Sequence, residues 1–218
     1  MTSAASGAAS EPVALADRRL YLCTPSRPDL ARFLTACIDG GVDVVQLRDK
    51  TGDDEALLEQ GRLALEVCRS RAVPLVMNDR PDLAARLGAD GVHVGQEDAP
   101  PREARATVGP DALVGLSTHA PAELDASEGE PVDYVSVGPV TPTPTKPGRP
   151  GTGLGYVAYA ATHCTRPFFI TGGVTPGTVA ELVDHGARHF VVVRHLTEAP
   201  RPGEAAAALR RAIDRALG

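Results

Sequence analysis

The chain has 218 residues, of which 43% are hydrophobic and only 4% aromatic, with no Trp. This length and composition allow one sizeable core and argue against two independent domains. The formal net charge of −6 argues against a nucleic-acid-binding face, and no stretch of the sequence is long and apolar enough to span a membrane.

The start of the chain is predicted to be a disordered tail over residues 1–15, because Ala, Ser and Gly dominate its first ten positions. It lacks the basic start and the apolar run of a signal peptide. The cysteines are widely spaced and form no CxxC pair; they are Cys23, Cys37, Cys68 and Cys164. This pattern predicts reduced core thiols in a cytoplasmic protein rather than a disulfide framework or a metal site.

Strands and helices are predicted to alternate along the remaining chain. Short apolar runs predict strands over 19–23, 42–47, 75–77, 92–94, 113–116, 134–137, 168–171 and 190–193. Helical periodicity and helix stop signals predict helices over 28–38, 53–71, 83–88, 101–108, 120–126, 156–164, 178–185 and 204–217. This alternation predicts an α/β fold, a single-domain (β/α)8 TIM barrel over 16–218, with an open doubly wound sheet as the alternative.

Two acids follow consecutive strands of this pattern. Asp79 and Asp98 are each followed within three residues by a proline that suits the first turn of a helix. Parallel strands would bring both carboxylates to the edge where α/β proteins bind ligands. Oxygen ligands without a Cys or His cluster favour Mg²⁺ over zinc, with waters and a substrate phosphate completing the shell. Helix N-capping is the alternative role for either acid.

Two lysines also follow strands. Lys50 comes just after the second strand, and Lys146 lies in the Pro- and Gly-rich loop over 141–155. Together with Mg²⁺ they could neutralise a diphosphate and turn it into a leaving group, although a surface location is the alternative for each. Gln46 and Asn78 carry amides that can hold a heteroaromatic ring or a phosphate through directional hydrogen bonds.

The later strands offer further polar groups. Ser117 could face a ligand or cap the next helix. Gly172 and Gly173 after the seventh strand, with Arg194 after the eighth, predict a second phosphate site at the usual place in such barrels. His93 alternates into the barrel and is predicted to have a core role. No Ser-His-Asp or Cys-His arrangement is visible in the sequence.

Five segments carry a more specific signal. They are QLRDK (46–50), MNDRPDLAARLGADGVHVGQED (77–98), VGLSTH (114–119), VSVGPVTPTPTKPG (135–148) and ITGGVTP (170–176). In this order they closely resemble the thiamine phosphate synthase family. The resemblance implies a Mg²⁺-dependent transferase of thiamine biosynthesis. Such an enzyme condenses hydroxymethylpyrimidine diphosphate with a thiazole phosphate, or its carboxylated form, by dissociative substitution and releases pyrophosphate.

The resemblance also implies roles for individual residues. It places the pyrimidine diphosphate at Gln46, Leu47, Arg48, Asp49, Lys50, Asn78, Ser117 and Lys146. Within that set it makes Lys50, Lys146 and Ser117 catalytic. The implied Mg²⁺ ligands, Asp79 and Asp98, agree with the reading of the residues themselves. It places the thiazole phosphate at Thr143, Pro144, Thr145, Gly173, Val193 and Arg194, although many family members have Ser where this chain has Arg194.

Two other functions are compatible with the same fold. A thiazole tautomerase would need no diphosphate clamp, and a non-catalytic sensor of thiamine precursors would lack a metal ligand or a clamp lysine. The joint presence of Lys50, Asp79, Asp98 and Lys146 favours the synthase. The expected partners are small-molecule substrates, with neither nucleic acid nor a membrane, and a homo-oligomer is left open.

Overall fold

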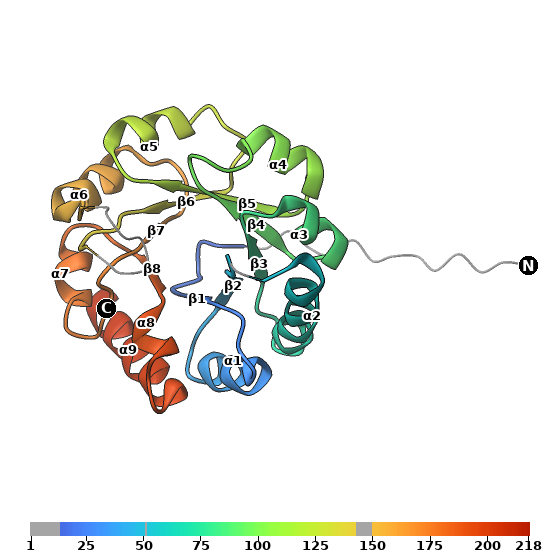
Figure 1. The fold of residues 1–218 in the computed structure, drawn as a ribbon. Helices are drawn as coiled ribbons and strands as arrows, with labels where there is room; N and C mark the ends of the chain where they lie inside the picture. The colour runs from blue at the N-terminus through green and yellow to red at the C-terminus, as the bar shows by residue number, and fades with distance from the viewer. Residues whose placement is uncertain (1–13, 51, 143–149) are drawn as a thin grey trace, which may run out of the picture.

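The computed structural model of the protein describes residues 14–50, 52–142 and 150–218. Its strands form one closed parallel barrel, seen along its axis in Figure 1. In the described part of the chain the strands are β1 (Leu20–Thr24), β2 (Val44–Leu47), β3 (Leu75–Asn78), β4 (Gly91–Val94), β5 (Leu113–Thr118), β6 (Tyr134–Val137), β7 (Phe168–Ile170) and β8 (His189–Val192). Each strand pairs with the next, and β8 closes on β1. The predicted (β/α)8 barrel is therefore confirmed, and the open sheet is wrong.

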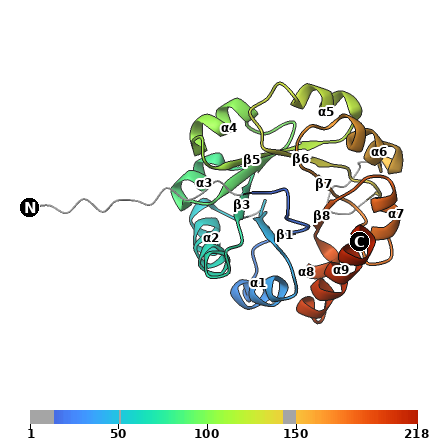
Figure 2. The same cartoon turned by 180° about the vertical axis from the view of Figure 1, so that it is seen from behind.

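The helices form an outer ring around the strands, as both views show (Figure 2). Within the described ranges they are α1 (Leu30–Asp39), α2 (Asp54–Arg69), α3 (Pro81–Leu87), α4 (Pro101–Val108), α5 (Pro121–Ser127), α6 (Gly153–His163), α7 (Val179–Asp184), α8 (Arg194–Thr197) and α9 (Pro202–Leu217). Helix α8 was not predicted, because four residues are too few to show a helical period. None of these described helices combines the length and the apolar character needed to cross a bilayer.

Two layers of core lie on either side of the sheet. The larger layer fills the space between strands and helices, and it is built mainly of Val, Leu and Ala. The smaller layer lies inside the barrel and includes Leu15, Tyr21, Tyr134 and Phe169. The Phe169 ring meets both tyrosine rings edge-on, at 5.4 Å between centroids. Aromatic residues are rare in this chain, and three of them fill the barrel interior.

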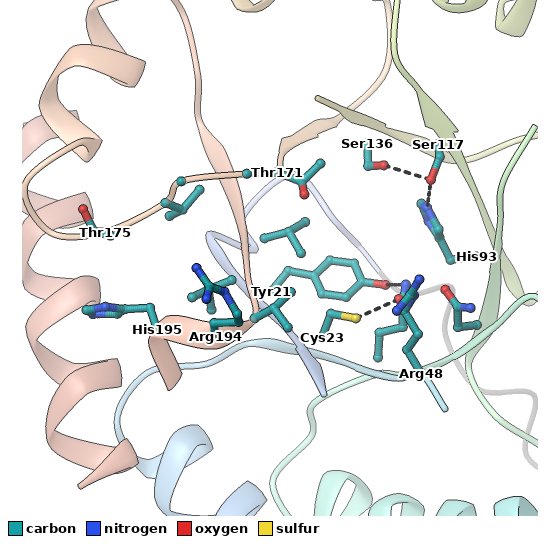
Figure 3. A pocket seen from close by; sticks show the side chains of 18 of the residues that line it. Tyr21, Cys23, Arg48, His93, Ser117, Ser136, Thr171, Thr175, Arg194 and His195 are labelled. Carbon is teal, nitrogen blue, oxygen red and sulfur yellow. Dashed lines mark hydrogen bonds between the residues drawn. The ribbon is translucent and has the colours of Figure 1, made fainter. Parts of the chain in front are cut away.

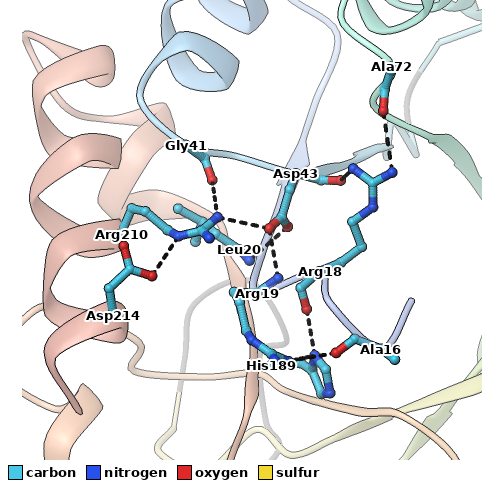
Figure 4. A network of polar contacts seen from close by, with 10 residues as sticks. All are labelled: Ala16, Arg18, Arg19, Leu20, Gly41, Asp43, Ala72, His189, Arg210 and Asp214. Atoms are coloured by element: carbon cyan, nitrogen blue, oxygen red, sulfur yellow. Dashed lines mark hydrogen bonds and ion pairs between the residues drawn. The ribbon is translucent and has the colours of Figure 1, made fainter. Parts of the chain in front are cut away.

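Aspartates join the strands at the amino-terminal face of the barrel. Asp43 accepts hydrogen bonds from the backbone N–H groups of Arg19 and Leu20, at 2.8 and 2.9 Å (Figure 4). Asp90 and Asp133 make similar contacts, since Asp90 accepts from the N–H of Leu75 at the start of β3 and Asp133 accepts from the N–H of Val114, the second residue of β5. Each aspartate precedes an even-numbered strand and holds the strand before it. This recurring contact helps to fix the register around the barrel.

Asp43 also ties the last helix to the sheet. Arg210 of α9 donates to the Asp43 carboxylate at 3.0 Å and to Asp214 at 2.9 Å. The Asp43 side chain is only 15% exposed, whereas that of Asp214 is 56% exposed. The two ion pairs of Arg210 therefore differ mainly in burial. A buried pair with further hydrogen bonds loses more when one partner is removed.

We expect Asp43→Ala to lower the free energy of unfolding by about 1–3 kcal/mol, because it leaves the N–H groups of Arg19 and Leu20 without their acceptor and removes the less exposed partner of Arg210. Asp214→Ala is the matched control, since it removes the exposed partner of the same arginine and should cost under about 0.5 kcal/mol. Urea unfolding of the three proteins measures both effects. Equal losses in the two variants would contradict the role given to Asp43.

Candidate active site

The carboxyl ends of the strands surround a pocket of about 350 Å³ (Figure 3). Side chains from β1 to β6 form its floor and one wall, and the segments after β7 and β8 form the other wall. The register places polar residues side by side at this end, pairing Cys23 with Gln46, Asn78 with His93 and Ser117 with Ser136. Polar groups that are distant in sequence therefore share one cavity.

The two predicted metal ligands follow neighbouring strands. Asp79 comes directly after β3 and has a φ of 60°, in the left-handed region that only Gly, Asn and Asp adopt readily. Its N–H donates to the His93 carbonyl at 2.8 Å, while the Asp98 carboxylate accepts from the N–H of Gly95 at 2.8 Å. Neither acid is a helix N-cap, since α3 and α4 are preceded by Arg80 and Pro100. The capping alternative is therefore wrong.

The charges around Asp79 indicate a place for a cation. Burial raises the pKa of Asp79, and the neighbouring Asp98 carboxylate raises it further. Lys50 opposes both effects, with its Nζ 3.3 Å from Asp79 Oδ2. Within the described ranges, no three acidic, His or Cys side chains gather as a metal cluster. Two neighbouring carboxylates fit Mg²⁺, which proteins usually hold through one or two carboxylates while waters and substrate phosphates complete its shell.

The predicted pyrimidine diphosphate residues divide between pocket and core. Gln46, Arg48, Asn78 and Ser117 line the pocket. Lys50 lies beside them through its contact with Asp79, and its side chain is 59% exposed. The side chain of Leu47 is instead buried in the core between the sheet and the helices. A ligand could therefore reach Leu47 only through its backbone.

Asp49 lies in the turn after β2, where its carboxylate accepts from the N–H of Gly52 at 3.3 Å. It is not among the residues that line the pocket. The catalytic Lys146 and the thiazole residues Thr143, Pro144 and Thr145 lie outside the described residues, so their predicted roles stay predictions.

The predicted thiazole phosphate end is built around the loops after β7 and β8. Gly173, Val193 and Arg194 line the pocket there, together with Gly172. Gly172 and Gly173 have φ values of 90° and 78°, and a Cβ on Gly173 would collide with Thr141. Glycine is therefore required for the close approach of these loops.

Arg194 begins the short helix α8, and its side chain is half exposed. Its guanidinium lies 4.0 Å from the Glu198 carboxylate, which also lines the pocket. Next to it, the buried Nε2 of His195 has no hydrogen-bond partner in the part of the chain that is described. The rim of this end therefore carries a cation, an acid and an imidazole, of which the sequence predicted only Arg194.

Several lining residues were not assigned to the site from the sequence. They are Tyr21, Cys23, Tyr134, Ser136, Thr171, Thr175, His195 and Glu198. Tyr21 and Cys23 alternate along β1, and Tyr134 and Ser136 alternate along β6, so all four point into the barrel. The alternation of side chains along a strand could have identified these four residues, because it places every second side chain inside the barrel. The prediction had instead relied mainly on residues that follow strands.

The structure also brings together a serine and a histidine that the sequence left apart. His93 Nε2 lies 3.0 Å from Ser117 Oγ, and His93 Nδ1 lies 3.1 Å from the Tyr134 hydroxyl. His93 is buried, as predicted, yet it contacts a predicted catalytic residue. The group on Nδ1 is a phenol and not a carboxylate, which distinguishes this contact from a Ser-His-Asp triad.

Comparison with known proteins gives one consistent family. A family model described as thiamine monophosphate synthase matches residues 20–196. A thiamine-phosphate synthase from Thermobifida fusca is 48% identical over 205 residues, covering 91% of this chain and 94% of the relative. One from Thermus thermophilus is 47% identical, covering 89% and 97%. The solved structure of a thiamine phosphate pyrophosphorylase from Pyrococcus furiosus is 25% identical, with a TM-score of 0.83 over 92% of this chain and 97% of that one.

The backbone of Asp79 allows its charge and its conformation to be tested separately. We expect Asp79→Asn to unfold, in EDTA, at a temperature equal to or above that of the unchanged protein, because it removes a charge that burial and Asp98 disfavour. Asp79→Ala removes the same charge, but alanine lacks the short polar side chain that allows Asp and Asn to adopt a φ of 60°. The alanine variant should therefore be less stable than Asp79→Asn by about 1–2 kcal/mol. Thermal and urea unfolding measure both differences, and equal stability of the two variants would contradict the strained backbone.

Proposed function

The chain belongs to the thiamine monophosphate synthase family, and on that premise we propose that it acts as a thiamine-phosphate synthase. The reaction joins hydroxymethylpyrimidine diphosphate to a thiazole phosphate and releases pyrophosphate. The cluster of Lys50, Asp79 and Asp98 beside the pocket carries this proposal. One cation and two acids suit a diphosphate that is bound through a divalent ion, whereas tautomerisation of a thiazole would need no such group.

Asp79 and Asp98 would hold Mg²⁺ through their carboxylate oxygens. When bound, Mg²⁺ supplies fixed positive charge that offsets the charge developing on the departing pyrophosphate. The raised pKa of Asp79 supports this assignment, because burial and the neighbouring Asp98 carboxylate both disfavour its charged form and a bound cation would favour that form. The strained backbone of Asp79 supports it as well, since such strain clusters at functional sites.

The cationic side chains would act on the diphosphate. Lys50 is held at the pocket mouth by Asp79 and can donate to phosphate oxygens, and Lys146 is its expected counterpart in the loop after β6. Arg48 lines the pocket and offers a guanidinium fork that matches phosphate geometry. Cationic groups at this place would stabilise the leaving group more as its negative charge grows.

The bond changes then need no protein nucleophile. The bond from the methylene carbon to the bridging oxygen breaks, and pyrophosphate leaves with the electron pair. The electron-rich aminopyrimidine stabilises the methylene cation, and the amides of Gln46 and Asn78 are placed to hold the ring. The thiazole nitrogen then donates its lone pair to the methylene carbon and forms the new C–N bond.

The second substrate would bind at the opposite end of the pocket. The Gly172-Gly173 turn and the start of α8 offer backbone N–H groups to the thiazole phosphate, and Arg194 adds a side-chain charge at the rim. The proposal places the enzyme in the cytoplasm, with these small molecules as its substrates. A carboxylated thiazole is kept as a substrate form to be tested alongside the plain one.

The first experiment is a product assay with both substrates and Mg²⁺, run beside an EDTA control. We expect thiamine phosphate and pyrophosphate in equal amounts with the metal, and a loss of at least about 100-fold in rate without it. Chromatography of the products measures both. Binding of both substrates without any product would contradict the synthase proposal, and tautomerisation of the thiazole would then be assayed.

Removal of single charges should separate the proposed roles. We expect Asp79→Asn and Lys50→Gln each to lower kcat by about 10²–10⁴-fold, the usual loss when fixed charge at a leaving group is removed. Arg86→Gln is the control, because it removes an exposed cation that pairs with Glu55 on the outer helices. Steady-state assays at saturating Mg²⁺ measure the effect. Near-normal turnover of the Lys50 variant would exclude Lys50 from the clamp.

A further inference from the structure

Hydrogen bonds connect buried side chains in a line along the floor of the pocket. Figure 3 shows the part that runs from His93 through Ser117 to Ser136. At one end the Cys23 thiol donates to Gln46 Oε1 at 3.2 Å, and Gln46 Nε2 donates to the Tyr21 hydroxyl at 2.8 Å. The hydroxyls of Tyr21 and Tyr134 are 3.0 Å apart. Burial raises the pKa of both phenols, so both keep their hydrogen at neutral pH.

The line continues from β6 to β4 and β5. The Tyr134 hydroxyl lies 3.1 Å from His93 Nδ1, and His93 Nε2 lies 3.0 Å from Ser117 Oγ. Ser136 donates to the same Ser117 oxygen at 3.4 Å. Gly115 makes room for this contact, because a Cβ there would collide with both Tyr134 and His93. The line therefore joins Gln46 to Ser117, two residues assigned to the same substrate.

The hydrogen bond from Gln46 sets the direction of the line. Tyr21 accepts from the Gln46 amide, so the Tyr21 hydrogen is left to point at Tyr134. In the reverse direction Tyr21 would accept from both neighbours, and its own buried hydrogen would have no acceptor among the described residues. A buried donor without an acceptor is costly. The favoured direction therefore runs from Gln46 through Tyr21 to Tyr134.

This direction decides the tautomer of His93. The Tyr134 hydroxyl, which accepts from Tyr21, donates to His93 Nδ1. A neutral imidazole that accepts at Nδ1 carries its hydrogen on Nε2. His93 therefore donates to Ser117 Oγ, and Ser136 donates to the same oxygen. Ser117 Oγ accepts in both of its contacts with described residues, so its own hydrogen is left for the pocket.

We propose that Tyr134 and His93 are positioning residues that turn the Ser117 hydroxyl into a hydrogen-bond donor facing the pocket. The inference rests on the proposed function and on the family resemblance, which assigns Ser117 to the pyrimidine diphosphate. A donor suits an anionic diphosphate, whereas an acceptor would repel it. The line through Tyr21 also fixes the amide of Gln46, so the two contacts to this one substrate are oriented together.

The same tautomer argues against a Ser-His nucleophile at this place. A general base would have to accept the Ser117 hydrogen at Nε2 and would need an acceptor, usually a carboxylate, on Nδ1. Tyr134 supplies a donor there, and Nε2 already carries hydrogen. His93 and Ser117 are close enough for a dyad. In the argued arrangement, however, His93 donates a hydrogen bond to Ser117, whereas a general base would accept one from the serine.

The tautomer can be measured without any substrate. In protein with ¹⁵N-labelled histidine, long-range ¹⁵N–¹H spectra distinguish Nε2–H from Nδ1–H imidazoles, and the spectrum of His93→Gln assigns His93 among the six histidines. We expect the Nε2–H form in the unchanged protein and a mixture or the other form in Tyr134→Phe. An Nδ1–H imidazole at His93 in the unchanged protein would overturn the proposal.

Kinetics test whether Tyr134 acts through His93. Tyr134→Phe should lower kcat/KM for the pyrimidine diphosphate by about tenfold or more, as expected when a hydrogen bond to a charged group is lost, and leave the KM of the thiazole phosphate within about twofold. Tyr159→Phe is the matched control, because it removes a hydroxyl that donates to Asp125 on the outer surface. An equal effect of both variants on both substrates would contradict a positioning role.

The conservative variant His93→Gln can still donate to Ser117 from its amide, so it should keep more activity than His93→Leu. In the His93→Gln background Tyr134→Phe should cost less than it does in the unchanged protein, because the part of its effect that passes through the imidazole is already lost. Independent, multiplying losses would overturn the proposal. If the unchanged enzyme makes no thiamine phosphate, the proposed function fails, while the tautomer spectra still decide the hydrogen-bond direction.

Discussion

Closure of the sheet by pairing of β8 with β1 is the constraint on which the rest of the structure depends. The closed strand order places β3 and β7 on opposite sides of the barrel, so that the residues at their carboxyl ends line opposite walls of one pocket. The Lys50 cluster and the Gly172-Gly173 turn can therefore face each other across a distance that two small substrates can bridge. Closure also creates an interior, which three aromatic rings and the hydrogen-bonded line fill.

Aspartates serve opposite purposes at the two ends of this barrel. At the amino-terminal face Asp43 receives two backbone N–H groups and an arginine, so its charge is matched. At the carboxyl-terminal face Asp79 lies beside a second carboxylate in a strained backbone conformation. The first arrangement stabilises the fold, and the second is tolerated by a fold that is stable elsewhere. The residues that stabilise the barrel are thus separated in space from those proposed to bind a charged ligand.

Strand order and the ends of strands were predictable from the sequence, because the apolar period and the turn residues report them directly. Asp79, Asp98, Ser117 and Gly173 were found this way. The hydrogen-bonded line was not predictable: its residues lie on β1, β2, β4, β5 and β6, and their contacts depend on register and on the space left by Gly115. Helix α8 was missed because its four residues contain no period. That Leu47 points away from the pocket follows from the pleat of β2, which turns the side chains of Gln46 and Leu47 to opposite faces of the sheet.

The scarcity of lysine determines how this protein reacts with reagents that modify amines. The chain carries 22 basic residues, and only those at positions 50 and 146 are lysines. Arginine forms most of the surface ion pairs, as in the fork of Arg80 between Asp54 and Asp82. Acylating reagents attack the amine of lysine and spare guanidinium groups. Acylation of Lys50 therefore modifies the mouth of the barrel, where its side chain is 59% exposed, and the rate of that acylation would report whether the pocket is occupied.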